Sequence, residues 1–241
     1  KIKKNDSINW SDLDYWMEKD IIIFGTGEFA DLCYFYINRH YKNKIKFFTV
    51  DDSHLKESKF NNLDILPFSE VKIKLKPIDY SFFCAISYTR MNSLRAEKFN
   101  EIKSNKYEFI NYIDERSVIA ENVQIGTNCL ILENQTIQPF VKIGDNSILW
   151  SSNHIGHGTS ININNYISSH VVISGNCNIG KNCFFGVNSS VKDFTSISDN
   201  CFIGMNANVV TDLSEQSTVV DNKSNIFDKN HKFSNLVRKK Y

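Results

Sequence analysis

Two histidines stand close together in the segment Asn153-His-Ile-Gly-His-Gly-Thr-Ser-Ile161. Imidazole is the side chain best suited to accept a proton near neutral pH, so His154 and His157 are candidate general bases. The alternative for His157 is a turn histidine without a role. The alternative for His154 is a side chain that only lines an outer face of the fold.

A six-residue repeat surrounds these histidines and runs without interruption from residue 117 to residue 209. Each step of six from Ile119 to Val209 lands on a large apolar residue, and the residue two places earlier is nearly always small. A helix repeats every ~3.6 residues and a simple strand every ~2, so neither predicts this pattern. The repeat predicts a parallel β-helix in which the two positions point inward.

Three such hexads make a coil of 18 residues, so residues 18 apart are expected to stack at the ~4.8 Å spacing of neighbouring strands. His157 then lies beside Pro139 on one coil and Gly175 on the next. It stands four residues before the inward Ile161, whereas His154 directly precedes the inward Ile155. The two histidines therefore occupy different positions on the coil, and His157 is the preferred base.

Length and charge limit the remaining possibilities. A chain of 241 residues with 41% hydrophobic content is long enough for two domains. Its net charge of +1 gives no electrostatic reason to expect nucleic acid or a membrane surface as a partner. The sequence shows neither an apolar run of ~20 residues nor a signal-peptide core, so we expect a cytoplasmic protein.

The six cysteines agree with this location. Four of them, Cys129, Cys177, Cys183 and Cys201, fall on the small inward position of the repeat, where free thiols act as compact apolar side chains. There is no C-x-x-C pair, so we expect no metal site.

The residues before the repeat predict a small Rossmann-like domain. An apolar strand at residues 21–24 leads into Gly25-Thr-Gly-Glu-Phe-Ala30, a helix to about Tyr41, and a second strand that ends at Asp51 and Asp52. In such a G-x-G-x-x-A turn, glycines let backbone amides approach phosphate at a helix N-terminus. Asp51 or Asp52 could then bind a ribose hydroxyl. The alternative is a glycine turn that only packs the helix on the sheet.

A third strand is predicted at residues 80–87, and it places Arg90 at the carboxyl edge of the sheet. An arginine there could bind a diphosphate bidentately, or it could be a solvated side chain in a loop. Three short βα units are enough for one nucleotide and short for two, which argues against a dehydrogenase.

We expect four segments along the chain. They are an N-terminal extension at 1–20, a Rossmann-like nucleotide-sugar-binding domain at 21–115, a β-helix domain at 116–212, and a Lys-rich tail at 213–241. No Pro/Gly linker separates the two domains, so they are expected to pack together. The tail is either free or closes over a cofactor.

Residues 117–210 resemble the left-handed β-helix acyltransferases of the hexapeptide-repeat type. Together with the Rossmann-like domain, about residues 21–215 resemble sugar acetyltransferases of the sialic acid O-acetyltransferase type, which include the bacillosamine-pathway and perosamine N-acetyltransferases. His154-Ile-Gly-His157 and the segment from Ile173 to Gly186 carry the resemblance most specifically. The left hand of the coil is implied by this resemblance alone.

The resemblance also implies a site. Family members are typically homotrimers that bind acyl-CoA between adjacent coils, which makes acetyl-CoA the expected cosubstrate. His157 matches the catalytic histidine, with His154 as a second catalytic candidate. Gly175 matches the glycine whose amide faces the thioester carbonyl, and the expected cofactor contacts are Gly175, Ile173, Gly186 and Gly204.

One position departs from the family. Relatives commonly carry Glu, Asp or Asn after the catalytic histidine to orient the imidazole, and this chain has Gly158. Either another residue or a neighbouring subunit orients His157, with His154, Asn153 and His170 as candidates, or catalysis depends more on binding and proximity.

We therefore expect an acetyl-CoA-dependent N-acetyltransferase that acts on a nucleotide-linked amino sugar. The resemblance implies a place in bacterial polysaccharide or lipopolysaccharide O-antigen synthesis. An O-acetyltransferase, or transfer of another acyl group, is the first alternative. A catalytically silent trimeric scaffold or sugar-nucleotide sensor is the second.

Overall fold

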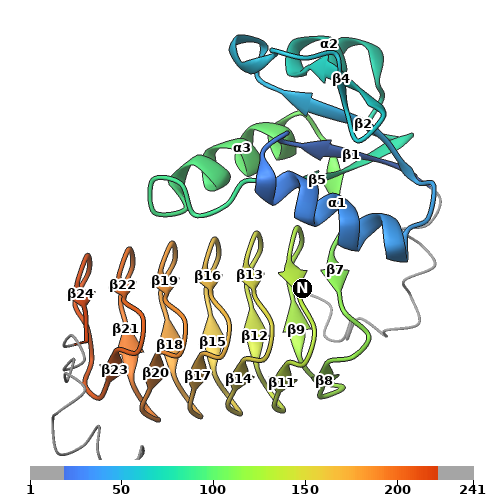
Figure 1. Cartoon of the computed structure of the whole chain (residues 1–241). Coiled ribbons are helices and arrows are strands. Elements are labelled where there is room, and N and C mark those ends of the chain that lie inside the picture. The colour runs from blue at the N-terminus through green and yellow to red at the C-terminus, as the bar shows by residue number, and fades with distance from the viewer. Residues whose placement is uncertain (1–18, 222–241) are drawn as a thin grey trace, which may run out of the picture.

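The computed structural model describes residues 19–221. Most of the N-terminal extension, including residues 1–18, and the tail from residue 222 lie outside the described residues. The described chain has two parts, a sheet with helices on both faces and a long triangular coil (Figure 1). None of its described helices has the length and apolar composition needed to cross a membrane.

The N-terminal part is a six-stranded sheet with the order β3-β4-β2-β1-β5-β6. All its neighbouring strands are parallel except β3 and β4. The strands are β1 (Asp20–Phe24), β2 (Ile45–Val50), β3 (Lys59–Phe60), β4 (Leu63–Pro67), β5 (Tyr80–Cys84) and β6 (Glu108–Phe109). The helices are α1 (Glu28–His40), α2 (Phe68–Lys74), α3 (Ser93–Ser104) and the short 3-10 helix η2 (Asp52–His54).

Side-chain alternation along β1 explains why both faces of this sheet are covered. Ile21 and Ile23 pack with the buried residues of α1, whereas Ile22 and Phe24 pack with those of α2 and α3. A central parallel strand needs apolar residues on both sides, which is why residues 21–24 read as a continuous apolar run. The chain adds β2 and β4 on one side of β1 and then β5 and β6 on the other, so the strand order reverses between β1 and β5, where such sheets bind ligands.

The C-terminal part is the predicted parallel β-helix, with three faces named here after one strand each. The β13 face contains β7 (Tyr112–Ile113), β10 (Leu130–Ile131), β13 (Ile148–Leu149), β16 (Tyr166–Ile167), β19 (Phe184–Phe185), β22 (Phe202–Ile203) and β24 (Thr218–Val219). The β14 face contains β8 (Val118–Ile119), β11 (Thr136–Ile137), β14 (His154–Ile155), β17 (Val172–Ile173), β20 (Ser190–Val191) and β23 (Asn208–Val209). The β15 face contains β9 (Gln124–Ile125), β12 (Lys142–Ile143), β15 (Ser160–Ile161), β18 (Asn178–Ile179) and β21 (Ser196–Ile197).

Stacking at 18 residues is the observed register, since Ile137 pairs with Ile155 and Ile155 with Ile173. The large apolar residues of the hexads and the apolar residues at the small position form one buried core, which includes the four predicted inward cysteines. The predicted fold class is confirmed. Coil strands also occur at Tyr112–Ile113 and Thr218–Val219, on either side of the residues expected to form this domain.

The N-terminal sheet packs on the β13 face of the coil. Figure 1 shows α1 between that face and the sheet, whereas α3 lies on the other face of the sheet and reaches the edge of the coil. One apolar cluster joins the two parts, because Cys33 and Ile37 of α1 share it with Leu130, Ile148 and Tyr166 of the coil. The two parts therefore form a common core rather than tethered units.

Arg95 of α3 is fully buried at this junction. Its Nη1 donates to the carbonyl of Ser87 at 2.7 Å and to Oδ1 of Asn92 at 3.0 Å. On the coil, its Nε and Nη2 donate to the carbonyls of Asn146, Asn164 and Asn165 at 3.0–3.2 Å. Burial lowers the pKa of Arg95 to about 10. The guanidinium fastens α3 and the loop before it to a corner of the coil.

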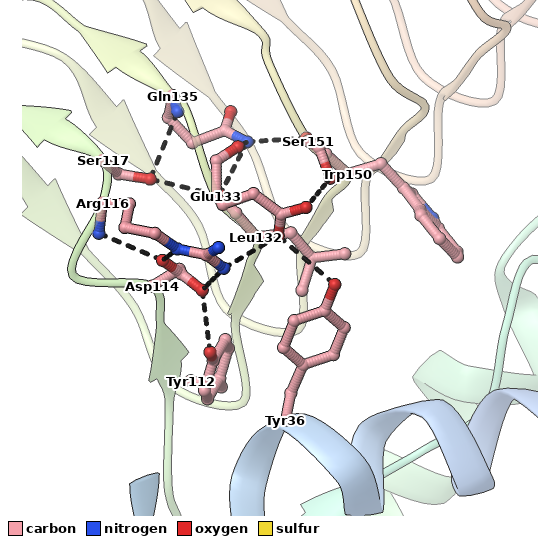
Figure 2. A network of polar contacts seen from close by, with 10 residues as sticks. All are labelled: Tyr36, Tyr112, Asp114, Arg116, Ser117, Leu132, Glu133, Gln135, Trp150 and Ser151. Atoms are coloured by element: carbon pink, nitrogen blue, oxygen red, sulfur yellow. Dashed lines mark hydrogen bonds and ion pairs between the residues drawn. The ribbon is translucent and has the colours of Figure 1, made fainter. Parts of the chain in front are cut away.

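A second polar network lies where the chain enters the coil (Figure 2). Arg116 donates to both carboxylate oxygens of Asp114 at 2.8 and 2.7 Å, and Tyr112 donates to the same group at 3.0 Å. The hydrogen bond from Arg116 is the main reason why the pKa of Asp114 falls to about 2. Tyr36 of α1 reaches across to Glu133 at 3.3 Å, so this network too joins the two parts.

Candidate functional site

His157 lies at the corner between β14 and β15, with its side chain exposed. Ile155 and Ile161 on either side point into the core and are almost completely buried. Because these two residues fix the register, the turn between them must project outward. The hexad pattern alone therefore places the imidazole on the outside of the coil.

Gln138 of the preceding coil holds this imidazole. Its Oε1 accepts a hydrogen bond from the backbone N–H of His157 at 2.9 Å and lies 3.3 Å from Nδ1 of the ring. An amide oxygen only accepts, so Nδ1 carries the proton and Nε2 carries the lone pair. The imidazole is thus held as the tautomer that a base acting through Nε2 requires.

Asn176 of the following coil approaches the opposite edge of the ring. Its Nδ2 lies 3.3 Å from Nε2 of His157, and its backbone N–H donates to the carbonyl of His157 at 2.7 Å. Gly158, which has a φ of +68°, leaves room for this side chain, because a Cβ there would lie 2.5 Å from Oδ1 of Asn176. The side-chain amide of Asn176 thus occupies the space that a larger residue at position 158 would need.

Gly175 lies directly against the imidazole. A Cβ at this glycine would come within 2.7–3.1 Å of three ring atoms of His157. Within residues 19–221, the Gly175 N–H has no hydrogen-bond partner. Gln138, which accepts the N–H of His157, stands 19 residues before it. The residue 19 places before Gly175 is Gly156, which has no side chain that could accept the N–H of Gly175. A base and an open N–H therefore lie side by side.

The other histidines do not join this corner. His154 is on the β14 face between Thr136 and Val172, one position from the turn. Asn153 is buried and donates to the carbonyl of Trp150, and His170 lies at the corner between the β13 and β14 faces. Sequence reasoning missed Gln138 and Asn176, which stand 19 residues from His157 and not the 18 of the strand register.

The expected cofactor contacts lie in three different environments. Gly175 is at the corner with His157, whereas Gly186 and Gly204 follow strands of the β13 face. Ile173 is fully buried in the core. A Cβ at Gly186 would lie 2.5 Å from the backbone of Met205, so close packing of coils already explains that glycine. One chain does not bring these residues into a single groove.

The two glycines after β1 have different reasons to be glycine. Gly25 has a φ of +120°, and a Cβ there would lie 2.9 Å from the carbonyl oxygen of Ala85. Gly27 has an ordinary extended backbone with a φ of −90°, and a Cβ there would meet nothing within 4 Å. The fold needs Gly25, but it does not need Gly27. Open space at the N-terminus of α1 is what an approaching phosphate requires.

A cavity of about 250 Å³ lies at the carboxyl ends of β1 and β2. Its lining includes Thr26, between the two glycines, and His54 and Lys56 from the loop after β2. These three residues were not among the predicted contacts, although their place after the first two strands is the signal that could have found them.

The predicted charged contacts already have protein partners. Asp51 accepts from Lys98 at 2.6 Å, and Asp52 accepts from the side chain of Ser69 at 2.6 Å, which lowers the pKa of Asp52. Arg90 forms an ion pair with Glu97. None of the three lines the cavity after β1 and β2. In residues 19–221, no three His, Cys, Asp or Glu side chains gather as a metal site.

Comparison with known proteins agrees with this architecture. Residues 176–209 match the family described as the hexapeptide repeat of succinyl-transferase. No curated protein sequence gives a significant match. A histidine-to-asparagine mutant of perosamine N-acetyltransferase from Caulobacter crescentus, in complex with CoA and GDP-perosamine, superposes with a TM-score of 0.74 at 17% identity, covering 84% of this chain and 97% of that one.

Two further solved structures are similar. The acetyltransferase domain of PglB from Neisseria gonorrhoeae, in complex with acetyl coenzyme A, has a TM-score of 0.71 at 15% identity and covers 81% of this chain and 93% of that one. WeeI from Acinetobacter baumannii has a TM-score of 0.53 at 19% identity and covers 87% and 100%. The described chain therefore has the fold of the hexapeptide-repeat sugar acetyltransferases, a Rossmann-like domain on a left-handed parallel β-helix.

Proposed function

We propose that this protein is an acetyl-CoA-dependent N-acetyltransferase whose acceptor is a nucleotide-linked amino sugar. The observation that carries the proposal is the outward corner where the oriented imidazole of His157 lies against Gly175 and its unpartnered N–H. Acyl transfer from a thioester needs a base for the nucleophile and a donor for the oxyanion, and this corner offers both.

The reaction would proceed by attack of the amine nitrogen on the thioester carbonyl carbon. The N–H of Gly175 would stabilise the negative charge that develops on the carbonyl oxygen. As the C–S bond breaks, Nε2 of His157 would take the proton lost by the nitrogen and pass it to the departing CoA sulfur. The products are the amide and CoA with a free thiol.

The nucleotide would bind to the N-terminal sheet. The open N-terminus of α1 at Gly27 suits the diphosphate, and the cavity lined by Thr26 and Lys56 suits the rest of the nucleotide. Asp51, Asp52 and Arg90 would have to exchange their present partners to contribute. Gly186, Gly204 and the backbone at Ile173 remain proposed contacts for CoA.

The two halves of the site lie on opposite sides of one chain. The N-terminal sheet and α1 pack on the β13 face (Figure 1). His157 follows β14, at the corner between the other two faces. A substrate held by one copy would therefore meet the histidine of another. We propose a homotrimer that binds acetyl-CoA between adjacent coils. The same proposal makes the protein a cytoplasmic enzyme of bacterial polysaccharide or O-antigen synthesis.

The direct test incubates the purified protein with acetyl-CoA and a panel of uridine, thymidine and guanosine diphosphate sugars, with an amine or a hydroxyl at the same carbon. A mass gain of one acetyl group on amino sugars alone supports the proposal. Acetylation of hydroxyl sugars alone would favour the O-acetyltransferase. If no sugar reacts and acetyl-CoA gives no protection against heat, the scaffold or sensor is favoured instead.

Replacement of Gly27 by valine is expected to raise KM for the nucleotide sugar about tenfold or more. Its Cβ meets no protein atom, so the melting temperature and KM for acetyl-CoA should stay near those of the wild type. Steady-state kinetics with each substrate varied in turn would measure this. An unchanged KM for the nucleotide sugar would place the diphosphate elsewhere.

Mixing two variants with complementary defects tests whether the site is shared between copies. Co-expressed Gly27→Val and His157→Ala chains, assayed at a nucleotide-sugar concentration far below KM of the Gly27→Val variant, should recover about a quarter of wild-type sites if each site takes one half from each of two neighbours in a random trimer. Chains that recover no activity after mixing would show that both halves belong to one copy.

A further inference from the structure

We infer that Gln138 and Asn176 are positioning residues for His157, and that this uncharged pair favours an amine over a hydroxyl as the acyl acceptor. The inference rests on the proposed function. It answers how His157 is oriented when the next residue is a glycine.

The geometry assigns the two amides complementary tasks. Gln138 accepts from both the backbone N–H and Nδ1 of His157, so one oxygen fixes the position and the tautomer of the ring. Asn176 donates to the lone pair of Nε2 from the other side. The ring is held by side chains of both neighbouring coils, and the backbone of Gly175 packs against it.

Gly158 makes this arrangement possible. Its absent Cβ leaves the space that Oδ1 of Asn176 occupies. A carboxylate-bearing residue at position 158 would displace the side chain of Asn176, because its Cβ would lie 2.5 Å from Oδ1 of that residue. The glycine at position 158 therefore leaves the space that Asn176 needs to contact His157.

Charged groups farther along the corner do not replace a carboxylate. Glu121 and Asp193 share the hexad position of His157 but stand two coils away on either side. Two strand spacings put them ~10 Å off, about one Debye length at moderate salt. Lys192 lies at a similar distance from His157, and its positive charge offsets the negative charges of Glu121 and Asp193. The only side chains of residues 19–221 that hydrogen-bond the imidazole are neutral.

A neutral orienter limits what the base can do. A carboxylate would stabilise the imidazolium and strengthen the base, whereas an amide oxygen fixes the ring without adding charge. A free amine is already nucleophilic and becomes acidic only once its nitrogen has attacked. A hydroxyl must lose its proton during the attack and needs the stronger base. The corner around His157 therefore suits an amine acceptor better than a hydroxyl acceptor.

The test compares three variants of the full-length protein. Gln138→Met keeps the size of the side chain but removes the acceptor, and Gln138→Glu supplies the carboxylate. Gln216→Glu makes the same charge change at an exposed corner residue near the far end of the coil and serves as the control. Long-range ¹H–¹⁵N spectra report the tautomer and the titration of His157 without any substrate, and kcat is measured against pH for an amino sugar and its hydroxyl analogue.

We expect the wild type to show a proton on Nδ1, and Gln138→Met to shift the population toward Nε2–H with kcat about tenfold lower and KM for acetyl-CoA unchanged. In Gln138→Glu, the titration midpoint of His157 and the acid limb of kcat should both rise by about one pH unit, and turnover of the hydroxyl sugar should gain relative to the amine. Gln216→Glu should match the wild type.

Three results would overturn the inference. They are a Gln138→Met variant with the wild-type tautomer and kcat, an unmoved midpoint in Gln138→Glu, and wild-type protein that acetylates the hydroxyl sugar as fast as the amine. The spectra keep this inference separate from the proposed function. If no sugar is acetylated, the function fails, yet the tautomer shift still decides whether Gln138 positions His157.

Discussion

Replacement of His157 by alanine is expected to lower kcat for the amino sugar about a hundredfold while both KM values stay within about twofold. General base catalysis is worth ~10²–10⁴. The lower end applies because the open N–H of Gly175 and the binding of both substrates remain, and because an amine asks less of its base. Steady-state kinetics with saturating acetyl-CoA would measure the loss.

The matched control is His40→Ala, which removes an exposed imidazole at the end of α1, outside the corner with His157. It should leave kcat within about twofold of the wild type, since it touches neither substrate. Equal turnover of the wild type and the His157→Ala variant, with both folded, would remove His157 from the mechanism. Catalysis would then rest on Gly175 and on proximity.

Replacement of Arg95 by methionine is expected to lower the free energy of unfolding by about 3–5 kcal/mol. The variant would leave the carbonyl oxygens of Ser87, Asn146 and Asn164 and Oδ1 of Asn92 without this donor, while the carbonyl of Asn165 keeps the N–H of Ile148. Each unsatisfied buried group costs ~1–3 kcal/mol, part of which relaxation recovers. Urea unfolding followed by circular dichroism would measure the loss.

Arg90→Met is the control for the loss of an arginine charge. Arg90 lies in an exposed ion pair with Glu97, which is worth at most ~0.5–1 kcal/mol. If the two variants are equally stable, Arg95 does not fasten the domains together. If the Arg95 variant unfolds in two steps while the wild type unfolds in one, the interface is what made the unfolding of the two parts cooperative.

The coil could be predicted residue by residue because its repeat is a local property. One apolar and one small residue in every six decide which side chains face inward, so Ile155 and Ile161 fix the outward corner of His157 without help from distant contacts. The turn after β1 was predictable for a similar reason, since the positive φ of Gly25 is a property of the turn itself. The pairing of β3, β4 and β6 leaves no comparable pattern in such short segments.

The partners of His157 could not be predicted from the strand register. Strand pairing joins residues 18 apart, but side chains at a corner lean along the coil, and Gln138 and Asn176 each lie 19 residues away. Arg95 was missed because its acceptors are carbonyls of a coil corner some 50–70 residues later in the chain. Asp51 and Asp52 were assigned to a ribose because the sequence does not show that Lys98 and Ser69 reach them.

The strand register of the coil also determines which changes of chain length the site can survive. Gln138, His157 and Asn176 come from three successive coils, and each coil is closed by apolar residues at fixed intervals. A single inserted residue within residues 138–176 would turn one of these side chains away from the others. A whole additional coil of 18 residues outside that segment would leave their relative positions intact. Insertions and deletions compatible with activity should therefore come in complete turns, and the protein can change its length without altering its chemistry.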